Sequence, residues 1–199
     1  ATGIPREEVR KRGKAQRGNT RFKKQLLSFQ EQEIMQRWVF HGGYTHGNRF
    51  YYNETITGRI DAYDFASSYP FVMLSEKFPV EKFTPMKNRS VNDILKDTEN
   101  AYFFKLILIN VELKDYMDPM PTLQFSKCEK TINVVTDNGR ILSADYVEIW
   151  LTEIDLRVIA SQYTYEKHIC LNIYAEHKDY LPRWYTDYIF ELFDAKCNL

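Results

Sequence analysis

The sequence predicts an α+β fold, with mostly antiparallel strands and a few helices that stand apart from them along the chain. Aromatic and β-branched residues crowd residues 38–73 between pairs of turn-forming residues, and residues 101–113 form one long apolar run. Residues 179–197 show an amphipathic pattern of helical period. With 199 residues, 44% of them apolar and 15% aromatic, the chain is long enough to bury a core.

The first residues are strongly basic and are expected to be partly helical. Residues 1–24 carry nine lysines and arginines against two glutamates, a charge of +7, whereas the net charge of the whole chain is zero. Pro5, the acids after it and the basic residues that follow favour a short helix that Gly13 ends. Residues 20–37 are expected to continue as a helical or mixed segment. The charge of +7 on residues 1–24 is expected about equally for an arm that contacts phosphates and for a solvated terminus.

The middle of the chain is expected to form strands and one short helix. Residues 38–73 are interpreted as antiparallel strands joined by tight turns, and residues 101–113 (AYFFKLILINVEL) give the strongest strand in the sequence. Between them, Ser90 is a suitable N-cap for a helix within residues 88–100 that places Ile94 on its packing face.

Turn and capping signals predict the remaining elements. Short strands are expected at residues 120–125 and 131–135. A hairpin turn is expected at Asp137-Asn138-Gly139, because Asn-Gly tolerates the positive φ angles of a type I′ turn. The later elements are a strand over 147–151, a helix capped by Thr152 and ending near Gln162, a strand over 163–174, and a final helix over 179–197.

Cysteine, histidine and membrane patterns exclude several kinds of site. The cysteines and histidines are widely spaced, without CxxC or HExxH patterns, so we expect reduced thiols and no zinc site; they are Cys128, Cys170, Cys197, His41, His46, His168 and His177. No apolar run reaches the length of about 18 residues that would span a bilayer, and the N-terminus does not resemble a secretory signal. We therefore expect a cytoplasmic protein with no membrane contact. The absence of an initiator Met further indicates a piece of a longer protein.

The segment best suited to carry chemistry is Asp61-Ala62-Tyr63-Asp64-Phe65-Ala66-Ser67-Ser68-Tyr69-Pro70. An aspartate at the end of a predicted strand, followed by a turn, can offer Mg²⁺ a carboxylate oxygen and backbone carbonyls. Asp61 and Asp64 should point to opposite faces of an extended strand, so only one of them can face such a site. From the residues alone, such an aspartate is more often a cap or a surface charge, and Tyr69 is more often a core residue.

Two motifs carry a resemblance to a known family. Asp64-x-x-Ser67-x-Tyr69-Pro70 resembles motif A of family B DNA polymerases, Dx2SLYP, with Ser68 in place of the usual leucine. Upstream, Phe40-His41-Gly42-Gly43-Tyr44-Thr45 is similar to the YxGG motif that protein-primed members place between their exonuclease and polymerase domains, although Phe40 lacks the hydroxyl of the family's tyrosine. The glycines would let a sugar-phosphate strand approach the backbone closely.

Later residues resemble the insertion called terminal protein region 1, in the order Pro121-Thr122-Leu123-Gln124, Trp150-Leu151-Thr152, Asp155-Leu156 and Tyr163. The chain is therefore identified as similar to protein-primed family B DNA polymerases of the organellar and viral type. The resemblance implies a palm-like antiparallel sheet with an inserted mixed α/β subdomain. It divides the chain into four parts. Residues 1–37 would be an exonuclease-side or linker segment, and residues 38–76 would contain the YxGG-like motif and the palm. Residues 77–177 would be the insertion, and residues 178–199 a helix returning toward palm or fingers.

The resemblance also implies roles for single residues. Asp64 would be catalytic and, with the main-chain carbonyl of Phe65, would hold two Mg²⁺ ions that activate the primer hydroxyl and stabilise the leaving pyrophosphate. Tyr69 would be a steric gate against ribose, and nucleotide binding would involve Phe65, Ser67, Ser68 and Tyr69. Template DNA would contact Phe40, Gly42, Gly43 and Thr45. The implied partners are template and primer DNA, dNTPs and a terminal priming protein.

Several family motifs do not occur in these residues, among them KxxxNSxYG, YxDTDS and the exonuclease acids. One aspartate of the metal site would therefore come from outside this sequence, and the chain alone is expected not to polymerise. Two other interpretations stay open. One is a non-catalytic module that binds nucleic acid or docks a protein through the basic arm and exposed aromatics. The other is a metal-dependent nuclease around Asp61 and Asp64, which lacks further supporting acids or histidines.

Overall fold

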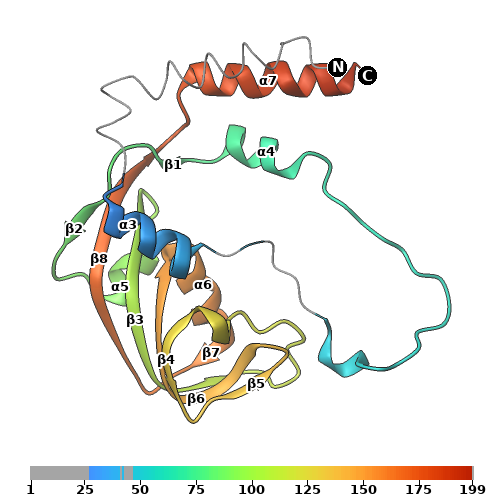
Figure 1. Cartoon of the computed structure of the whole chain (residues 1–199), viewed down its shortest axis with the longest axis vertical. Helices are drawn as coiled ribbons and strands as arrows, with labels where there is room; N and C mark the ends of the chain where they lie inside the picture. Colours follow the sequence, from blue (N-terminus) through green and yellow to red (C-terminus); the bar gives the residue numbers. More distant parts are fainter. Residues whose placement is uncertain (1–26, 41, 43–46, 199) are drawn as a thin grey trace. The chain divides into compact units, whose positions relative to one another are not determined.

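The computed structural model describes most of the chain, namely residues 27–40, 42 and 47–198. The chain folds as two compact units, whose elements Figure 1 labels. The larger unit is made of two stretches, Ser28–Arg59 and Thr84–Ala175. The described part of the smaller unit is made of Leu27, Ile60–Phe83 and residues 176–198.

An antiparallel sheet forms the body of the larger unit. Its two long central strands pair from Phe103↔Thr152 to Glu112↔Ser143; they are β3 (Asn100–Leu113) and β6 (Arg140–Thr152). Two shorter strands pair with β6, namely β4 (Cys128–Ile132) and β5 (Val135–Asp137). On its other side, β3 pairs with β8 (Lys167–Asp179), and β8 pairs in turn with β2 (Thr84–Met86). The short strand β7 (Tyr163–Thr164) pairs with the end of β3. The predicted α+β fold with an antiparallel sheet is thus confirmed.

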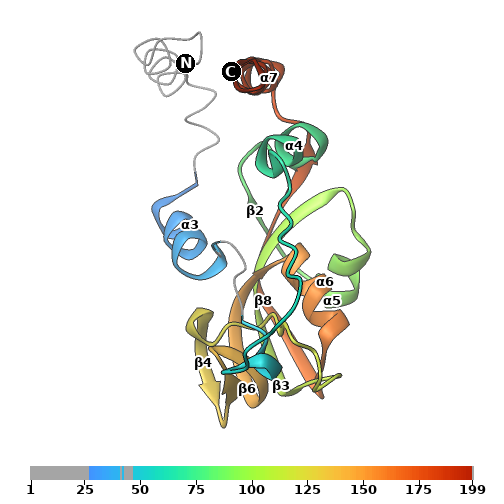
Figure 2. The ribbon, with the colours of Figure 1, turned by 90° about the vertical axis from the view of Figure 1, so that its right-hand side faces the viewer.

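The core of the larger unit lies where two helices pack on this sheet. Figure 2 shows α5 (Val91–Lys96) and α6 (Glu153–Gln162) on one side of the strands and α3 (Phe29–Ile34) on the other. Alternate residues of β3, Phe104, Leu106 and Leu108, have no exposed surface and belong to one buried cluster with α5 and α6. Burying each such side chain contributes about 1.5–3 kcal/mol. The apolar run that predicted a strong strand therefore also supplies the centre of the core.

Local signals predicted two helix starts and one turn correctly. Ser90 and Thr152 are the N-caps of α5 and α6, and each hydroxyl accepts a hydrogen bond from the backbone N–H three residues on, at 3.2 and 3.3 Å. Between β5 and β6, Asn138 and Gly139 have φ angles of 45° and 75°, as a type I′ turn requires. These features depend on a few neighbouring residues, which is why the sequence predicted them.

The smaller unit is built on a helix pair. α4 (Ser68–Ser75) packs against α7 (Arg183–Cys197), and β1 (Phe78–Pro79) pairs antiparallel with the end of β8. Within the parts of the chain that the structure describes, no helix has the length and apolar character that crossing a membrane requires.

The prediction of strands over residues 38–73 is wrong for the residues of this stretch that the structure describes. They form the end of a π-helix (Met35–Val39), a 3₁₀ helix (Arg49–Tyr51) and α4, joined by irregular chain. Strand conformation is stable only where a neighbouring strand takes up the backbone hydrogen bonds. Here the aromatic side chains face solvent instead, with Tyr63 92% and Phe65 86% exposed.

The short strands predicted before the hairpin are also partly wrong. In place of a strand over 120–125, Gln124 forms an isolated bridge with Arg140, and a 3₁₀ helix follows at Phe125–Lys127. The strand predicted over 131–135 is divided between β4 and β5 at Asn133, whose φ of 48° interrupts extended backbone.

The C-terminal elements differ from the prediction at their boundaries. The strand predicted over 163–174 is divided into β7 and β8, and β8 continues to Asp179, where it pairs with β1. The last helix therefore begins at Arg183 and not at Asp179. Pro182 precedes it, where a fixed φ and a missing N–H do not oppose a helix start.

Candidate active-site segment and helix groove

The motif-A-like residues lie in the smaller unit, where irregular chain turns into α4. Asp64 and Phe65 are exposed and belong to no strand, so the predicted strand end at Asp64 is wrong. A turn that includes Ser67 leads to Ser68, the first residue of α4. Tyr69 follows in the first helical turn and is 75% exposed. The proposed metal ligand and the proposed sugar gate therefore stand on the two sides of one turn.

Ser67 has a left-handed backbone conformation, with φ 55° and ψ 37°, at the N-cap position of α4. For a residue with a Cβ atom this conformation costs roughly 1–2 kcal/mol. The Ser67 carbonyl accepts the Phe71 N–H at 3.0 Å, whereas its hydroxyl does not cap the helix and accepts from the Lys196 ammonium at 3.2 Å. Lys196 lies in the last turn of α7, so this contact joins the turn to the C-terminal helix.

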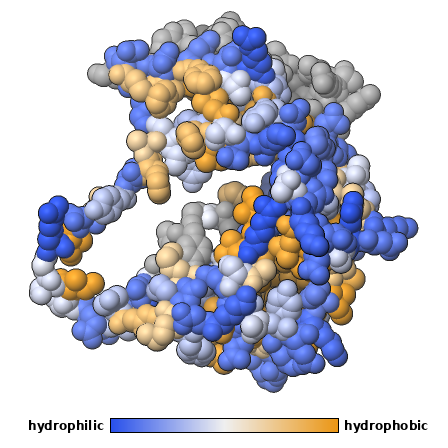
Figure 3. All heavy atoms as spheres, turned by 180° about the vertical axis from the view of Figure 1, so that it is seen from behind, coloured by the Kyte–Doolittle hydropathy of each residue, from blue (hydrophilic) through white to orange (hydrophobic). Residues whose placement is uncertain are grey.

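An open groove of about 450 Å³ lies between α4 and α7. Its wall is largely apolar and aromatic and consists of Ser67, Tyr69, Pro70, Met73, Tyr185, Tyr188, Ile189, Leu192, Phe193 and Lys196. Figure 3 shows hydrophobic side chains gathered on this helix pair. Hydroxyl groups and one ammonium group are the polar parts of the wall. Such a groove suits a flat, partly apolar group that carries a few polar atoms.

The groove contains Ser67 and Tyr69 of the motif, but not Asp64, Phe65 or Ser68. Among the residues that the structure describes, no group of three His, Cys, Asp or Glu side chains could hold a metal ion. Asp64 nevertheless offers an exposed carboxylate beside the Phe65 carbonyl, and these are donors that Mg²⁺ prefers. They fit one part of a magnesium site and not a complete one.

The YxGG-like residues lie in the larger unit, where the structure describes Phe40 and Gly42. Phe40 follows the π-helix and is 69% exposed. A Cβ atom added at Gly42 would meet no atom within 4 Å, so the backbone there is open to close approach. The predicted contacts at Gly43 and Thr45, like the basic arm of residues 1–24, lie outside the described residues.

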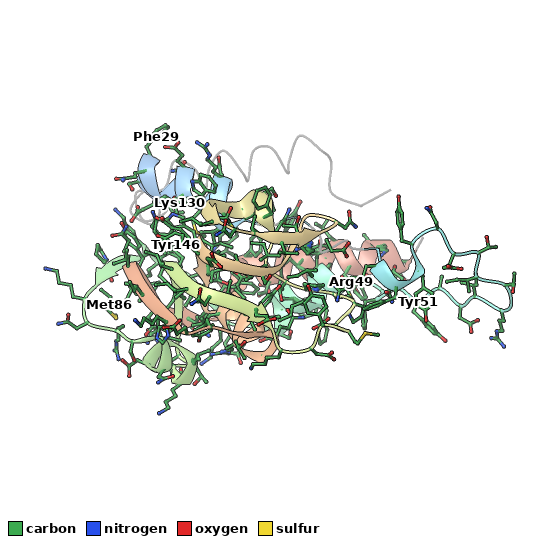
Figure 4. All side chains as sticks on the ribbon, turned by 90° about the horizontal axis from the view of Figure 1, so that it is seen from below. Phe29, Arg49, Tyr51, Met86, Lys130 and Tyr146 are labelled. Atoms are coloured by element: carbon green, nitrogen blue, oxygen red, sulfur yellow. The ribbon has the colours of Figure 1, made fainter. Side chains whose placement is uncertain are left out.

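A polar cluster on the sheet of the larger unit has a structural explanation. The Lys105 ammonium lies 2.5 Å from the Glu129 carboxylate and 2.8 Å from that of Glu148. Burial acts to lower the pKa of Lys105, but these hydrogen bonds and charges raise it overall. Next to this cluster, Lys130 lies 5.5 Å from the ring centre of Tyr146, and Figure 4 labels these two residues. The Lys105 ammonium on β3 bridges a carboxylate on β4 and one on β6, so the cluster ties these three strands together.

Lys196 is one of three groove residues to which sequence reasoning assigned no role; the others are Met73 and Tyr185. The apolar spacing of the last helix puts Tyr188, Ile189 and Leu192 on its packing faces. A further step of four residues leads to Lys196, so helical spacing already put this lysine on the same face. Its partner could not be found in this way, because Ser67 lies 129 residues away along the chain.

Comparisons with known proteins give one family and two similar structures. A family model described as DNA polymerase type B, organellar and viral, matches residues 22–199. Phi29 DNA polymerase in an orthorhombic crystal form is similar at 18% identity, with a TM-score of 0.46 over 66% of this chain and 21% of that chain. Phi29 DNA polymerase complexed with primer-template DNA is similar at 17% identity, with a TM-score of 0.41 over 65% of this chain and 22% of that chain. The chain thus spans about a fifth of the length of these structures. A search of curated proteins finds no match.

Proposed function

Because this chain belongs to the family of DNA polymerases of type B, organellar and viral, we propose that it forms part of a DNA-directed DNA polymerase that adds dNTPs to a protein or DNA primer. The observation that carries this proposal is the family match over residues 22–199, which includes both the YxGG-like and the motif-A-like residues. The chain offers one candidate carboxylate for the metal site. We therefore assign catalysis to a longer protein and expect the chain alone to be inactive.

We assign the stretches of the chain by the same resemblance. Residues 38–76 would belong to the palm, residues 77–177 would be terminal protein region 1, which contacts DNA and a terminal priming protein, and residues 178–199 would return toward palm or fingers. The groove that α7 shares with α4 supports the last of these assignments. Residues 1–37 would be an exonuclease-side segment or linker. The polymerase would act in the cytoplasm of a host cell or in an organelle.

Asp64 would be a ligand of the catalytic metal ions. Its carboxylate is exposed directly before the turn into α4, beside the carbonyl of Phe65. When bound, Mg²⁺ would neutralise phosphate charge and polarise the reacting oxygens. An aspartate outside these residues would complete the site. The contribution of this chain to the metal site would be one carboxylate, placed directly before the residues that would bind the nucleotide.

Tyr69 would select the sugar of the incoming nucleotide. It lies in the first turn of α4, lines the groove and is 75% exposed, so its ring offers a flat surface to a deoxyribose. A ribose 2′-hydroxyl would collide with that ring. Ser67 and Ser68 would face the triphosphate near the start of α4, where backbone N–H groups and the helix dipole favour negative charge.

The YxGG-like residues would contact the template strand. The open backbone at Gly42 and the exposed ring of Phe40 support this role, because a sugar-phosphate strand can approach the first and a base can stack on the second. Gly43 and Thr45 would contribute to the same contact.

The test of Asp64 is Mg²⁺-dependent dNTP incorporation by the full-length polymerase that contains this sequence. Asp64→Ala should lower incorporation by at least about 100-fold, because a lost metal ligand removes several kcal/mol of transition-state stabilisation. Asp61→Ala changes a carboxylate in the same irregular segment and is the matched control, which should keep its activity. Unchanged incorporation in Asp64→Ala would reject the assignment of motif A.

The test of Tyr69 is the choice between ribonucleotides and deoxyribonucleotides by the same polymerase. Tyr69→Val should lower the ratio of kcat/KM for dNTP over rNTP by about 10- to 200-fold, because steric exclusion in a pocket is worth that much. Tyr63→Val removes an aromatic ring that is 92% exposed and is not part of the groove, so it should leave the ratio unchanged. Equal ratios in wild type and Tyr69→Val would remove the steric gate from the proposal.

Exposed aromatic side chains in the irregular chain between the 3₁₀ helix Arg49–Tyr51 and α4 favour one alternative function, a non-catalytic module that binds nucleic acid. Tyr52, Tyr63 and Phe65 are between 80% and 92% exposed, and aromatic rings are platforms on which unpaired bases stack. This alternative predicts that the full-length protein binds single-stranded DNA and incorporates no nucleotide. The incorporation assay above therefore separates the two functions.

A further inference from the structure

The sheet of the larger unit has a second face, on the side away from α5 and α6. Along β6, Val147 and Ile149 belong to the buried cluster that includes these helices, and Tyr146 and Glu148 alternate with them. Because successive side chains of a strand point to opposite faces, Tyr146 and Glu148 lie on the second face. Figure 2 shows α3 on this side of the sheet, and Figure 4 labels Lys130 and Tyr146 there.

The elements on the second face are joined into one surface. The π-helix Met35–Val39 packs against β6 and against the 3₁₀ helix Phe125–Lys127. The Lys127 ammonium donates to the backbone carbonyl of Arg37 at 3.1 Å. β4 follows this 3₁₀ helix directly and pairs with β6. Side chains of the π-helix, the 3₁₀ helix and β4 therefore lie close together.

Three cations of this surface have no acid bound to them. The Arg37 guanidinium lies 4.7 Å from the ring centre of Trp38, just as the Lys130 ammonium lies over the ring of Tyr146. Within the described part of the chain, neither of these cations nor Lys127 forms an ion pair with a carboxylate. Arg37 and Lys130 are also exposed, so their charges are accessible to an anion.

Two carboxylates near these cations are bound to other groups. Glu129 accepts from the Lys105 ammonium at 2.5 Å and from the Trp150 indole N–H at 2.7 Å. Glu148 accepts from the same ammonium at 2.8 Å and from the Tyr146 hydroxyl at 3.2 Å. Each carboxylate oxygen thus has its own donor within the fold, and the surface keeps more cations than carboxylates.

Aromatic rings lie among these cations. Phe125 is 45% exposed, and Trp38 and Tyr146 are half-buried beneath Arg37 and Lys130. Unpaired bases stack on aromatic rings and on guanidinium groups, while lysines and arginines bind the phosphates of the strand. A duplex offers phosphates to such a surface but no free base faces. The combination of rings and cations therefore favours a single strand.

We propose that this basic-aromatic surface binds single-stranded DNA, with phosphates on the cations and a base on Phe125. The surface consists of Arg37, Trp38, Phe125, Lys127, Lys130 and Tyr146. The inference rests on the proposed function, because a polymerase that copies DNA has to hold an unpaired template strand. It goes beyond that function by assigning the strand to a face of the larger unit that contains none of the motif-A-like residues.

The experiment measures binding of a fluorescent oligo(dT) of about 12 nucleotides, within the usual size of a single-strand site. The whole 199-residue chain is used, and anisotropy is recorded at several salt concentrations. Arg37→Met and Lys130→Met should each lower the slope of log K against log salt concentration by about 0.7, because each removes one phosphate contact. Phe125→Ala should weaken binding by about 5- to 150-fold at an unchanged slope, because a stacked base is lost.

Matched variants control for net charge and for side-chain size. Lys167→Met removes the charge of a lysine on β8 that is 71% exposed, and it should keep the wild-type slope. Arg37→Lys keeps the charge and should keep the slope, and Phe125→Tyr keeps the ring and should keep the affinity. Arg37 and Lys130 lie on different elements, so either variant tests the surface by itself if the other lowers the Tm.

Each outcome decides the proposal. Smaller slopes in Arg37→Met and Lys130→Met, together with weaker binding in Phe125→Ala, support it. Wild-type slopes in both charge variants overturn it. Smaller slopes with wild-type affinity in Phe125→Ala show a surface that contacts phosphates alone, which overturns the choice of a single strand. The incorporation assay with Asp64→Ala tests the proposed function independently of this binding, so the two can fail separately.

Discussion

The carboxylate of Asp97, just after α5, collects hydrogen bonds from two side chains. The Tyr102 hydroxyl donates to it at 2.6 Å and the Asn100 amide at 2.8 Å. Burial acts to raise the pKa of Asp97, but these hydrogen bonds lower it from 3.8 to about 2. Burial and the neighbouring carboxylate raise the pKa of Tyr102 from 10.0 to about 12. An ionised carboxylate and a neutral phenol therefore join the end of α5 to β3.

Asp97→Asn should lower the free energy of unfolding at pH 7 by about 1–2 kcal/mol, because a pKa shift of this size is a stability contribution and the side chain is partly exposed. The pKa is lower in the folded state than in the unfolded state. The contribution is therefore complete above the unfolded value of 3.8 and is lost as the pH falls toward 2. In urea denaturation from pH 7 to pH 2, wild type and variant should converge in acid.

The matched control for this variant is Asp187→Asn. Asp187 lies 3.8 Å from Arg183 in an exposed ion pair, which contributes little to stability. A difference between wild type and Asp97→Asn that stayed constant down to pH 2 would show that the charge of the carboxylate is not its source.

At the scale of the element, α6 shows how a local signal and a packing pattern act together. The Asp155 carboxylate accepts from the backbone N–H of Thr152 at 3.0 Å and from its hydroxyl at 2.7 Å. Leu156 and Ile159 follow on the buried face, with 0% and 2% of their surface exposed. The cap determines where the helix begins, and the apolar spacing determines which face it buries.

Thr152→Ala should lower the free energy of unfolding by about 1 kcal/mol, the usual contribution of an N-cap hydroxyl. Thr152→Ser keeps the hydroxyl and should keep most of the stability, whereas Leu156→Ala should cost about 2–5 kcal/mol because it leaves a cavity. Urea denaturation followed by tryptophan fluorescence measures all three. If Thr152→Ala were as stable as Thr152→Ser, the cap hydroxyl would contribute nothing to α6.

Two stretches of similar composition became different elements. Residues 101–113 and 38–73 are both rich in aromatic and β-branched residues, yet only the first is a strand. β3 pairs with β6 over most of its length and buries alternate side chains against α5 and α6. The described residues of the second stretch pair with no strand and leave their rings in solvent. Whether a stretch forms a strand therefore depends on a neighbouring strand to pair with as much as on its own residues.

At the scale of the molecule, the two units differ in how much apolar surface they bury. The buried cluster of the larger unit includes residues of β3, β6, α5 and α6. In the described part of the smaller unit, the buried apolar side chains are Phe83 and Ile189, and α4 has none. Because apolar burial is the main source of stability, the smaller unit should open at a lower free energy than the larger one.

Hydrogen exchange should show this difference directly. Backbone amides of α4 and α7 should exchange at least about 100-fold faster than those of β3 and β6 at pH 7, because small units with little buried surface open locally. Mass spectrometry of peptic peptides from the whole chain measures both sets in one experiment. Equal protection of α7 and β3 would contradict the difference inferred from burial.

The sequence by itself determined the local features and the candidate residues. Capping boxes, an Asn-Gly turn and one long apolar run depend on neighbours within a few positions, so they could be read before any fold was known. The motif at Asp64–Pro70 and the YxGG-like residues were named in the same way, and the family match covers both. Their chemical roles stay predictions for the incorporation assay.

Only the tertiary structure decided which segments found partners. It left residues 49–65 without a strand, brought Lys196 to Ser67, and placed Lys127 on the carbonyl of Arg37. These contacts join positions 129 and 90 residues apart, and no local pattern encodes such a pairing. The physical reason is that backbone hydrogen bonds and apolar surface can be satisfied by many segments of similar composition, and the folded chain selects among them by packing all of them at once.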